Sequence, residues 1–200
     1  MMFRRVFVAA ICGLALAAAA TGQAAANTAD QFIATVGKRA IDSLTVKTLS
    51  DQERETRFRN ILRESFDVPE IGRFVLGRYW RTATDQEKAE YIRLFEEFVV
   101  KSYSNRFADF AGEEFKVGQA IESPDKDKLV SSEIVQPHGK PPIRLVWRVR
   151  NSGSEFKVVD VAVEGISMSV TQRDEFAAVI RNSSGKVSGL IDALKKKTGK

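Results

Sequence analysis

The chain has 200 residues, of which 44% are hydrophobic and 28% charged, and its formal net charge is +5. These values fit one globular domain, and the positive charge is too modest and too dispersed to indicate a nucleic-acid-binding protein. With one cysteine and one histidine, the chain lacks the ligands for a zinc or redox-metal centre.

The first 26 residues have the three parts of a secretory signal peptide. Arg4 and Arg5 precede an apolar run over residues 6–20, and the alanines at 24–26 offer a cleavage site. The apolar run is about fifteen residues long, whereas a helix needs roughly twenty to span a bilayer, which disfavours a retained membrane anchor. We therefore expect a cleaved signal peptide and an exported protein.

The expected mature chain, residues 27–200, contains no cysteine. Cys12 leaves with the signal peptide, and Ile11 stands where a lipoprotein signal needs a small residue. Loss of Arg4 and Arg5 lowers the formal net charge from +5 to +3. An exported domain without disulfides must be stabilised by its hydrophobic core alone.

The first half of the mature chain is predicted to be helical. Capping boxes at Thr28–Gln31 and Ser50–Glu53 mark two helix starts. A third, short helix begins after Asp67, with Pro69 tolerated in its first turn, and Gly77 is its expected end.

The longest predicted helix runs from a further capping box at Thr84–Glu87 to about Phe110. Its neighbouring acidic residues, Glu96 and Glu97, are expected to be solvated surface. Its apolar stripe is either core packed on a sheet or, in part, the lining of a cavity, and periodicity does not separate the two. The stripe consists of Tyr91, Ile92, Phe95, Phe98, Val99, Tyr103, Phe107 and Phe110.

The second half changes to the two-residue period of β-strands. In the clearest strand, apolar residues alternate with Arg144, Arg148 and Arg150, which predicts a half-buried strand with an arginine-rich outer face. Short turns separate the strands, so we expect an antiparallel meander. The four predicted strands are 114–121, 128–136, 143–150 and 156–163.

Two helices are predicted to close the chain. Thr171 is the expected cap of a helix over 172–182, and a last helix follows over 187–197. Helices followed by a meander indicate an α+β fold, with N-terminal helices and the long aromatic helix packed on a curled antiparallel sheet of four or more strands. The single domain, 27–200, divides into a mainly helical part, 27–112, a sheet, 113–164, and C-terminal helices, 165–200.

No constellation of catalytic residues is apparent in the sequence. His138 lies in a proline-rich turn and is expected to be solvated, and there is no glycine-rich phosphate loop, GxSxG or HExxH motif. Asp160 shares a predicted strand face with Phe156, Val158 and Ala162, which suggests a partly buried carboxylate. Such an acid could be the general base of an isomerase or dehydratase; pairing with an arginine or plain exposure is favoured over that role.

Two stretches resemble the MlaC family, the toluene-tolerance or ABC-transporter auxiliary proteins of the Gram-negative periplasm. The first, residues 66–81, contains an LGxxW pattern and leads into the aromatic helix. The second, residues 158–168, contains D-V-x-V-E-G-x-S and continues to Phe176. The resemblance covers essentially the whole mature chain.

This resemblance implies a periplasmic lipid carrier without a cofactor or enzymatic activity. Family members bind the acyl chains of a phospholipid between helices and a sheet of nuclear-transport-factor-like shape. They exchange lipid between an outer-membrane lipoprotein complex and an inner-membrane ABC transporter with substrate-binding subunits. A hopanoid-associated branch makes a polycyclic lipid an alternative cargo, and a pure interaction module with a solid core is a further alternative.

Carried onto this chain, the resemblance predicts an apolar hollow between the aromatic helix and the sheet. Arg144 and Arg148 are candidates for contact with a lipid headgroup or a partner, although ordinary solvation of the sheet face would also explain them. The expected lipid-binding residues are Leu76, Tyr79, Trp80, Phe95, Val99, Tyr103, Phe107, Trp147, Val149, Val161, Ile166 and Met168.

Overall fold

The computed structural model describes residues 28–110, 112–137, 139–153 and 155–200. The expected signal peptide, residues 1–26, and the expected solvated His138 therefore lie outside the described residues. Within the described ranges, no helix combines the length and the apolar character that crossing a membrane requires.

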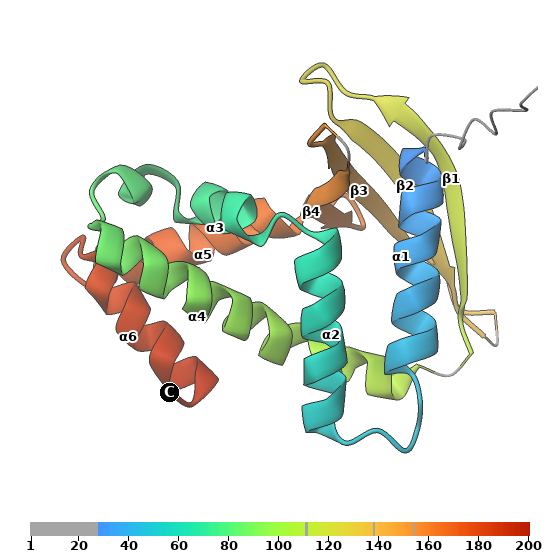
Figure 1. The fold of residues 1–200 in the computed structure, drawn as a ribbon, viewed down its shortest axis with the longest axis horizontal. Coiled ribbons are helices and arrows are strands. Elements are labelled where there is room, and N and C mark those ends of the chain that lie inside the picture. The colour runs from blue at the N-terminus through green and yellow to red at the C-terminus, as the bar shows by residue number, and fades with distance from the viewer. Residues whose placement is uncertain (1–27, 111, 138, 154) are drawn as a thin grey trace, which may run out of the picture.

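The described chain forms an α+β fold in the order that the sequence predicts (Figure 1). The N-terminal helices are α1 (Ala29–Leu44), α2 (Asp51–Ser65), α3 (Val68–Leu76), the 3-10 helix η1 (Gly77–Arg81), α4 (Asp85–Tyr103) and the 3-10 helix η2 (Ser104–Asp109). The strands are β1 (Glu114–Glu122), β2 (Lys128–Val135), β3 (Ile143–Asn151), β4 (Phe156–Val163) and β5 (Ile166–Ser167). The C-terminal helices are α5 (Met168–Asn182) and α6 (Val187–Thr198).

The predicted helix starts are confirmed by their capping bonds. At the start of α2, the amide of Glu53 donates to the Ser50 hydroxyl at 3.3 Å, and the Ser50 amide donates to the Glu53 carboxylate at 3.0 Å. At the start of α4, the Thr84 amide donates to the Glu87 carboxylate at 2.8 Å. At the other end of α3, Gly77 has a φ of +58°, which favours glycine and ends the helix.

The long helix ends earlier than the sequence predicts. We expected it to reach Phe110, but α4 ends at Tyr103 and the chain continues as η2. The serines and asparagine at this point have low helix propensity, because their side chains compete for backbone hydrogen bonds. The change of direction places the Phe107 ring 6.0 Å from that of Phe58 on α2.

The helix after the sheet begins earlier than predicted. Ser167, rather than Thr171, caps α5, since its hydroxyl accepts the Val170 amide at 3.1 Å. The Thr171 hydroxyl instead donates to the carbonyl of Ser167, inside the first turn. The prediction of Thr171 as the cap is therefore wrong; both residues have cap-forming side chains, and the structure uses the earlier one.

The sheet is an antiparallel meander with the strand order β1-β2-β3-β4-β5, which confirms the prediction and adds a short fifth strand. A bulge in the β3–β4 pair changes which β4 residues face inward. Asp160 therefore lies opposite Arg148 on the outer face and does not share the face of Phe156 and Val158, as we had expected. The pairs around the bulge are Val149–Val158, Arg148–Asp160 and Trp147–Val161.

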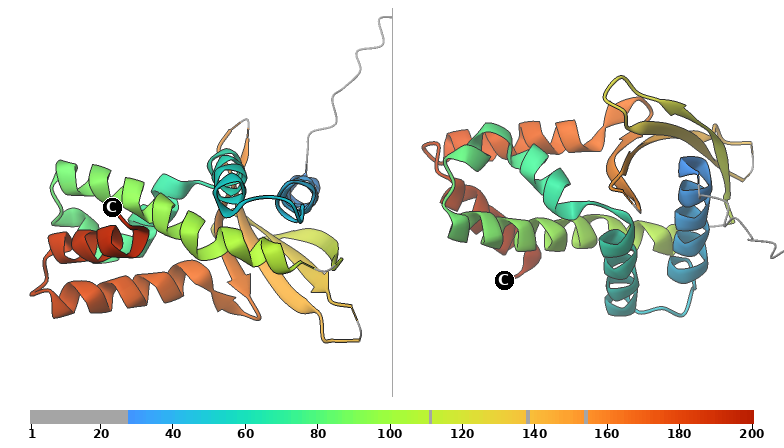
Figure 2. Two further views of the ribbon diagram at one scale, coloured as in Figure 1. Left: turned by 90° about the horizontal axis from the view of Figure 1, so that it is seen from below. Right: turned by 45° about the horizontal axis from the view of Figure 1, so that its top comes forward.

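The sheet curls around α1, which lies against its concave side (Figures 1 and 2). Helices α3, α4, α5 and α6 form a separate layer that extends away from the sheet, and α2 lies between α1 and α4. The aromatic stripe of α4 packs mainly among these helices, against α3, α5 and α6.

Candidate functional site

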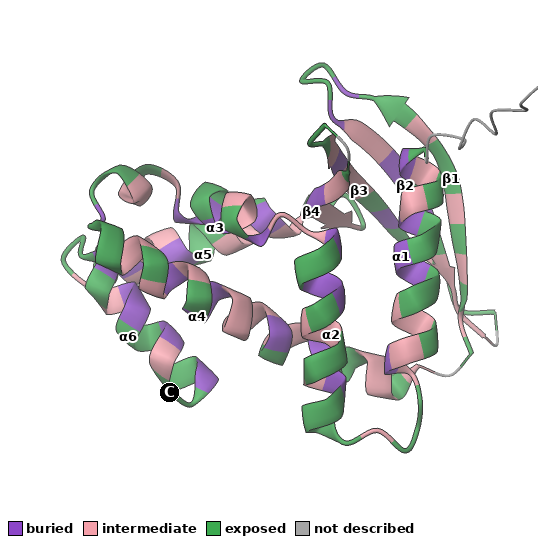
Figure 3. Cartoon of the chain, viewed as in Figure 1, coloured by how far each residue is buried: buried purple, intermediate pink, exposed green. Residues whose placement is uncertain are grey.

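The buried apolar residues form three separate clusters, whereas a domain usually has one contiguous core. The helical cluster joins α3, α4, α5 and α6, and includes Tyr91, Leu94 and Phe95. The sheet cluster joins α1 to the concave face of the sheet, and contains Ala29, Ile33, Val130, Val149 and Val158. The α1–α2 cluster is smaller and contains Val36, Leu44 and Ile61. Figure 3 shows how these buried positions are distributed over the fold.

Three half-buried phenylalanines link the clusters, and we call them the junction phenylalanines. Phe32 packs against the sheet cluster and the α1–α2 cluster. Phe58 packs against the α1–α2 cluster and the helical cluster. Phe66 packs against the helical cluster and the sheet cluster. Since all three keep part of their surface exposed, accessible apolar area remains where the clusters meet.

Further aromatic rings extend this junction along the sheet. The Trp147 ring lies 6.5 Å from that of Phe66 and 6.3 Å from that of Phe115 on β1. The Trp147 indole N–H donates to the Ser132 hydroxyl at 2.8 Å, so its polar atom is satisfied within the sheet. The Phe32 ring lies 6.0 Å from the ring of Phe156. The junction is thus almost wholly hydrocarbon.

The position of Phe66 is fixed by the short link between α2 and α3. Phe66 forms an isolated parallel bridge with Val158, and the Asp67 amide donates to the Val158 carbonyl at 3.0 Å. The Asp67 carboxylate in turn accepts the Glu70 amide at 3.1 Å and caps α3. This link therefore holds an aromatic side chain between the edge of β4 and the helical layer.

An ion-pair network joins α2 to α4 beside the junction. Arg59 binds both Glu96 and Glu97 at 3.0 Å, and Arg63 binds Glu96 at 2.8 Å. The expectation that these carboxylates are solvated surface is wrong, because each side chain is only 16% exposed. Burial acts to raise the pKa of Glu96, but hydrogen bonds from Arg63 and Arg59 outweigh it and hold the pKa below its ordinary value.

The predicted lipid-binding residues fall into different places. Leu76 and Phe95 are buried members of the helical cluster, and Tyr79, Trp80 and Val99 pack against this cluster. In the sheet cluster, Val149 is buried, and Trp147 and Val161 pack against it. Phe107 packs against the α1–α2 cluster. The structure therefore divides the α4 and sheet residues between two clusters and does not gather them around one hollow.

The remaining three predicted residues lie elsewhere. Tyr103 is half-buried at the end of α4, where burial raises the pKa of its phenol. Ile166 is 62% exposed on β5, and Met168 begins α5 instead of lying on the sheet.

Sequence reasoning missed the junction phenylalanines as site residues. Phe58 and Phe66 have helical spacing with Ile61 and Leu62, which predicts one buried face but not which clusters that face would meet. Phe66 also stands immediately before the Asp67 cap, a signal that places it at a helix–helix corner.

Arg144 and Arg148, which we expected to contact a headgroup or a partner, form ion pairs with carboxylates on the outer face of the sheet. Arg144 lies 3.4 Å from Glu164, and its side chain is 73% exposed. Arg148 binds Asp125 and lies 3.8 Å from Asp127. These partners balance much of their charge.

Asp160 has a structural role in the described chain. Its carboxylate accepts the Ser167 hydroxyl at 2.6 Å and the Ser169 amide at 3.1 Å, at the first turn of α5. Its hydrogen-bond partners are thus serines, and the half-buried carboxylate shows neither the arginine pairing nor the plain exposure that were the favoured alternatives. Among the residues that the structure describes, no group of three or more His, Cys, Asp and Glu side chains is arranged to hold a metal ion.

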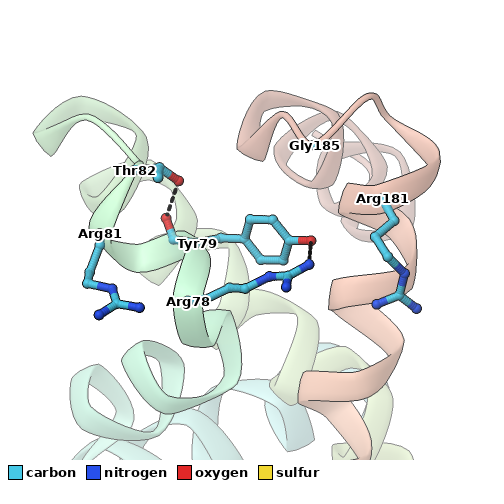
Figure 4. A pocket seen from close by; sticks show the side chains of 6 residues that line it. All are labelled: Arg78, Tyr79, Arg81, Thr82, Arg181 and Gly185. Atoms are coloured by element: carbon cyan, nitrogen blue, oxygen red, sulfur yellow. Dashed lines mark hydrogen bonds between the residues drawn. The ribbon is translucent and has the colours of Figure 1, made fainter.

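An open hollow of about 630 Å³ lies between η1 and the turn that joins α5 to α6 (Figure 4). It is at the end of the helical layer that is remote from the sheet (Figure 1). Its lining residues are Arg78, Tyr79, Arg81, Thr82, Arg181 and Gly185. Three arginines line this hollow, unlike the junction.

Comparison with known proteins gives a family and a fold. The sequence model of a family described as "MlaC protein" matches residues 30–196. A Haemophilus influenzae protein named "Intermembrane phospholipid transport system binding protein MlaC" is 26% identical over 116 residues. That match covers 56% of this chain and 54% of the relative, so the chain spans about half the length of the curated relative it matches.

A solved structure shares the fold. The phospholipid-binding protein of Ralstonia solanacearum, solved in complex with a phospholipid, superimposes with a TM-score of 0.75 at 20% identity. The superposition covers 86% of this chain and 97% of the other.

Proposed function

Because the chain belongs to the MlaC family, we propose that it is a non-enzymatic carrier that binds the acyl chains of a phospholipid at the aromatic junction. The observation that carries this proposal is the division of the core into three clusters linked by half-buried phenylalanines. The named function of the Haemophilus relative and the phospholipid in the Ralstonia structure support it.

The energetics favour a protein carrier. Two sixteen-carbon chains contain roughly thirty methylenes, each worth about 0.8 kcal/mol to keep from water, so free transfer of such a lipid would cost on the order of 24 kcal/mol. A surface of Phe and Trp rings removes much of this cost without any cofactor. We propose that the acyl tails pack against Phe32, Phe66 and Trp147, at the junction where the three hydrophobic clusters meet.

Membership of the MlaC family supports a finer role. We propose that the mature protein works in the periplasm and exchanges lipid between an outer-membrane lipoprotein complex and an inner-membrane ABC transporter with substrate-binding subunits. A hopanoid or other polycyclic lipid is the alternative cargo, since the same rings would cover a fused-ring hydrocarbon.

Native mass spectrometry tests the proposal. The full chain, expressed in a Gram-negative host and purified without detergent, should carry lipid in near-stoichiometric amount, and extraction should identify a phospholipid or a hopanoid. Phe66→Ala should lower the lipid occupancy several-fold. The matched control is Phe74→Ala, which removes a 42% exposed phenylalanine on α3.

Thermal melting should show that both variants remain folded. Phe66→Leu keeps much of the apolar volume and should retain more lipid than Phe66→Ala. A folded wild-type protein that carries no lipid, and takes none from phospholipid vesicles, would contradict the proposed function.

A further inference from the structure

We propose that the hollow between η1 and the α5–α6 turn is a phosphate-binding site, separate from the aromatic junction. It goes beyond the proposed function, because none of its lining residues belongs to the three junction phenylalanines or to their aromatic partners. The ligand class is a phosphate group, carried either by a free phosphate or by the headgroup of a membrane phospholipid.

The lining of the hollow is strongly cationic. Arg78, Arg81 and Arg181 contribute three positive charges, and no acidic residue lines the space. None of the ion pairs among the described residues involves these three arginines. By contrast, Arg59 and Arg148 bind carboxylates. Like charges around one hollow repel each other, so an anion that enters it is favoured.

The side chains approach from two elements. Figure 4 shows Arg78 and Tyr79 extending from η1 toward α5, and Arg181 extending along α5. The Arg81 side chain leaves η1 on the side that faces away from α5. The α5 C-terminus by itself would disfavour an anion, and Arg181 in its last turn counters that effect. All three arginines are exposed, so their long side chains are free to close on a ligand.

The hydrogen-bond donors that line the hollow suit the oxygen atoms of a phosphate group. Arginine presents a planar fork of N–H groups that matches phosphate and binds it through two parallel hydrogen bonds. The Tyr79 hydroxyl accepts a hydrogen bond from Arg78 at 3.0 Å, which leaves the phenolic proton available to donate to a ligand. The Arg78 guanidinium also lies 4.9 Å from the Tyr79 ring centroid, a contact that orients the pair.

Binding should be measured on the full protein with two probes. Isothermal titration with sodium phosphate, at constant ionic strength set with NaCl, reports on free phosphate. Co-sedimentation with phosphatidylglycerol–phosphatidylcholine vesicles reports on headgroups. The test variant is Arg78→Ala/Arg181→Ala, and the control is Arg93→Ala, which removes an exposed arginine of α4 outside the hollow.

We expect the double alanine variant to weaken binding of one probe at least tenfold, and Arg93→Ala to leave it unchanged. Loss confined to the titration identifies free phosphate, whereas loss confined to the vesicles identifies the headgroup. Arg78→Lys/Arg181→Lys keeps the charge without the fork and should bind with intermediate affinity.

Equal binding by the wild type and the double alanine variant in both assays would overturn the site. Lipid content by native mass spectrometry should be the same in wild type and double variant, because the hollow is remote from the junction. A failure of the carrier function would instead appear in the wild type as absence of lipid, so the two proposals fail separately.

Discussion

Gly37 of α1 lies where the helix approaches β1 too closely for a side chain. A Cβ built on it would lie 2.2 Å from Cε1 of Phe115, the ring that packs on Trp147. Gly37→Ala should therefore displace Phe115 and lower the free energy of unfolding by about 1–3 kcal/mol, the usual range for overpacking. Urea denaturation measures this change.

A second substitution tests the cause. Phe115→Leu in the Gly37→Ala background removes the ring that clashes, and should recover part of the lost stability. If the double variant is as unstable as the sum of the two single variants, the contact between Gly37 and Phe115 is not the reason.

Glu96 should make stability depend on pH. Its pKa is lower in the folded protein than its ordinary value of 4.5, so its contribution is present above about pH 4.5 and is lost as the pH falls through the folded value. Glu96→Gln should destabilise the protein at pH 7, and the difference from wild type should shrink toward pH 3. Urea titrations at several pH values measure it, and Asp174→Asn, an exposed carboxylate of α5, controls for general charge loss.

The Asp160 carboxylate stabilises the first turn of α5, because it accepts the Ser167 hydroxyl and the Ser169 amide. Asp160→Ala should lower the free energy of unfolding by about 0.5–2 kcal/mol, the range for loss of a helix cap, and Asp160→Asn by less. Circular dichroism melts measure this effect. Lipid occupancy should be retained in both variants; a variant of normal stability that has lost its lipid would argue against a purely structural carboxylate.

At the scale of elements, helix starts and strand order could be predicted from local sequence signals, whereas features that depend on tertiary contacts could not. The starts of α2 and α4 were predictable, because each capping box lies within four residues. The strand order was predictable because short turns leave antiparallel neighbours. The bulge that moves Asp160 to the outer face arises from pairing between β3 and β4, and no pattern within β4 reveals it.

At the scale of the whole molecule, periodicity identified the buried face of α4 but not its partners. Phe95 has the spacing of a core residue, and the structure buries it against Phe176 of α5 and not against the sheet. A hydrophobic stripe identifies the buried face of a helix but not the element that packs against that face. The candidate site was therefore predictable in composition, as aromatic residues of helices and sheet, but not in its location at the junction.

The two tryptophans offer a direct test of that location. The chain has Trp80 and Trp147, and sequence reasoning placed both near the ligand. In the structure Trp147 belongs to the junction, whereas Trp80 packs against the helical cluster with Lys88 5.8 Å from its ring centroid. Trp80→Phe leaves Trp147 as the single emitter, and its fluorescence should shift to shorter wavelength when delipidated protein takes up phospholipid, because tails replace water around the ring.

Trp147→Phe leaves Trp80 as the emitter, and its spectrum should stay unchanged during the same titration, provided that the variant still takes up lipid by native mass spectrometry. A shift of Trp80 emission with constant Trp147 emission would move the tails into the helical layer. Because the two reporters belong to different clusters, the comparison distinguishes a ligand held where the clusters meet from one held inside the α3–α6 layer.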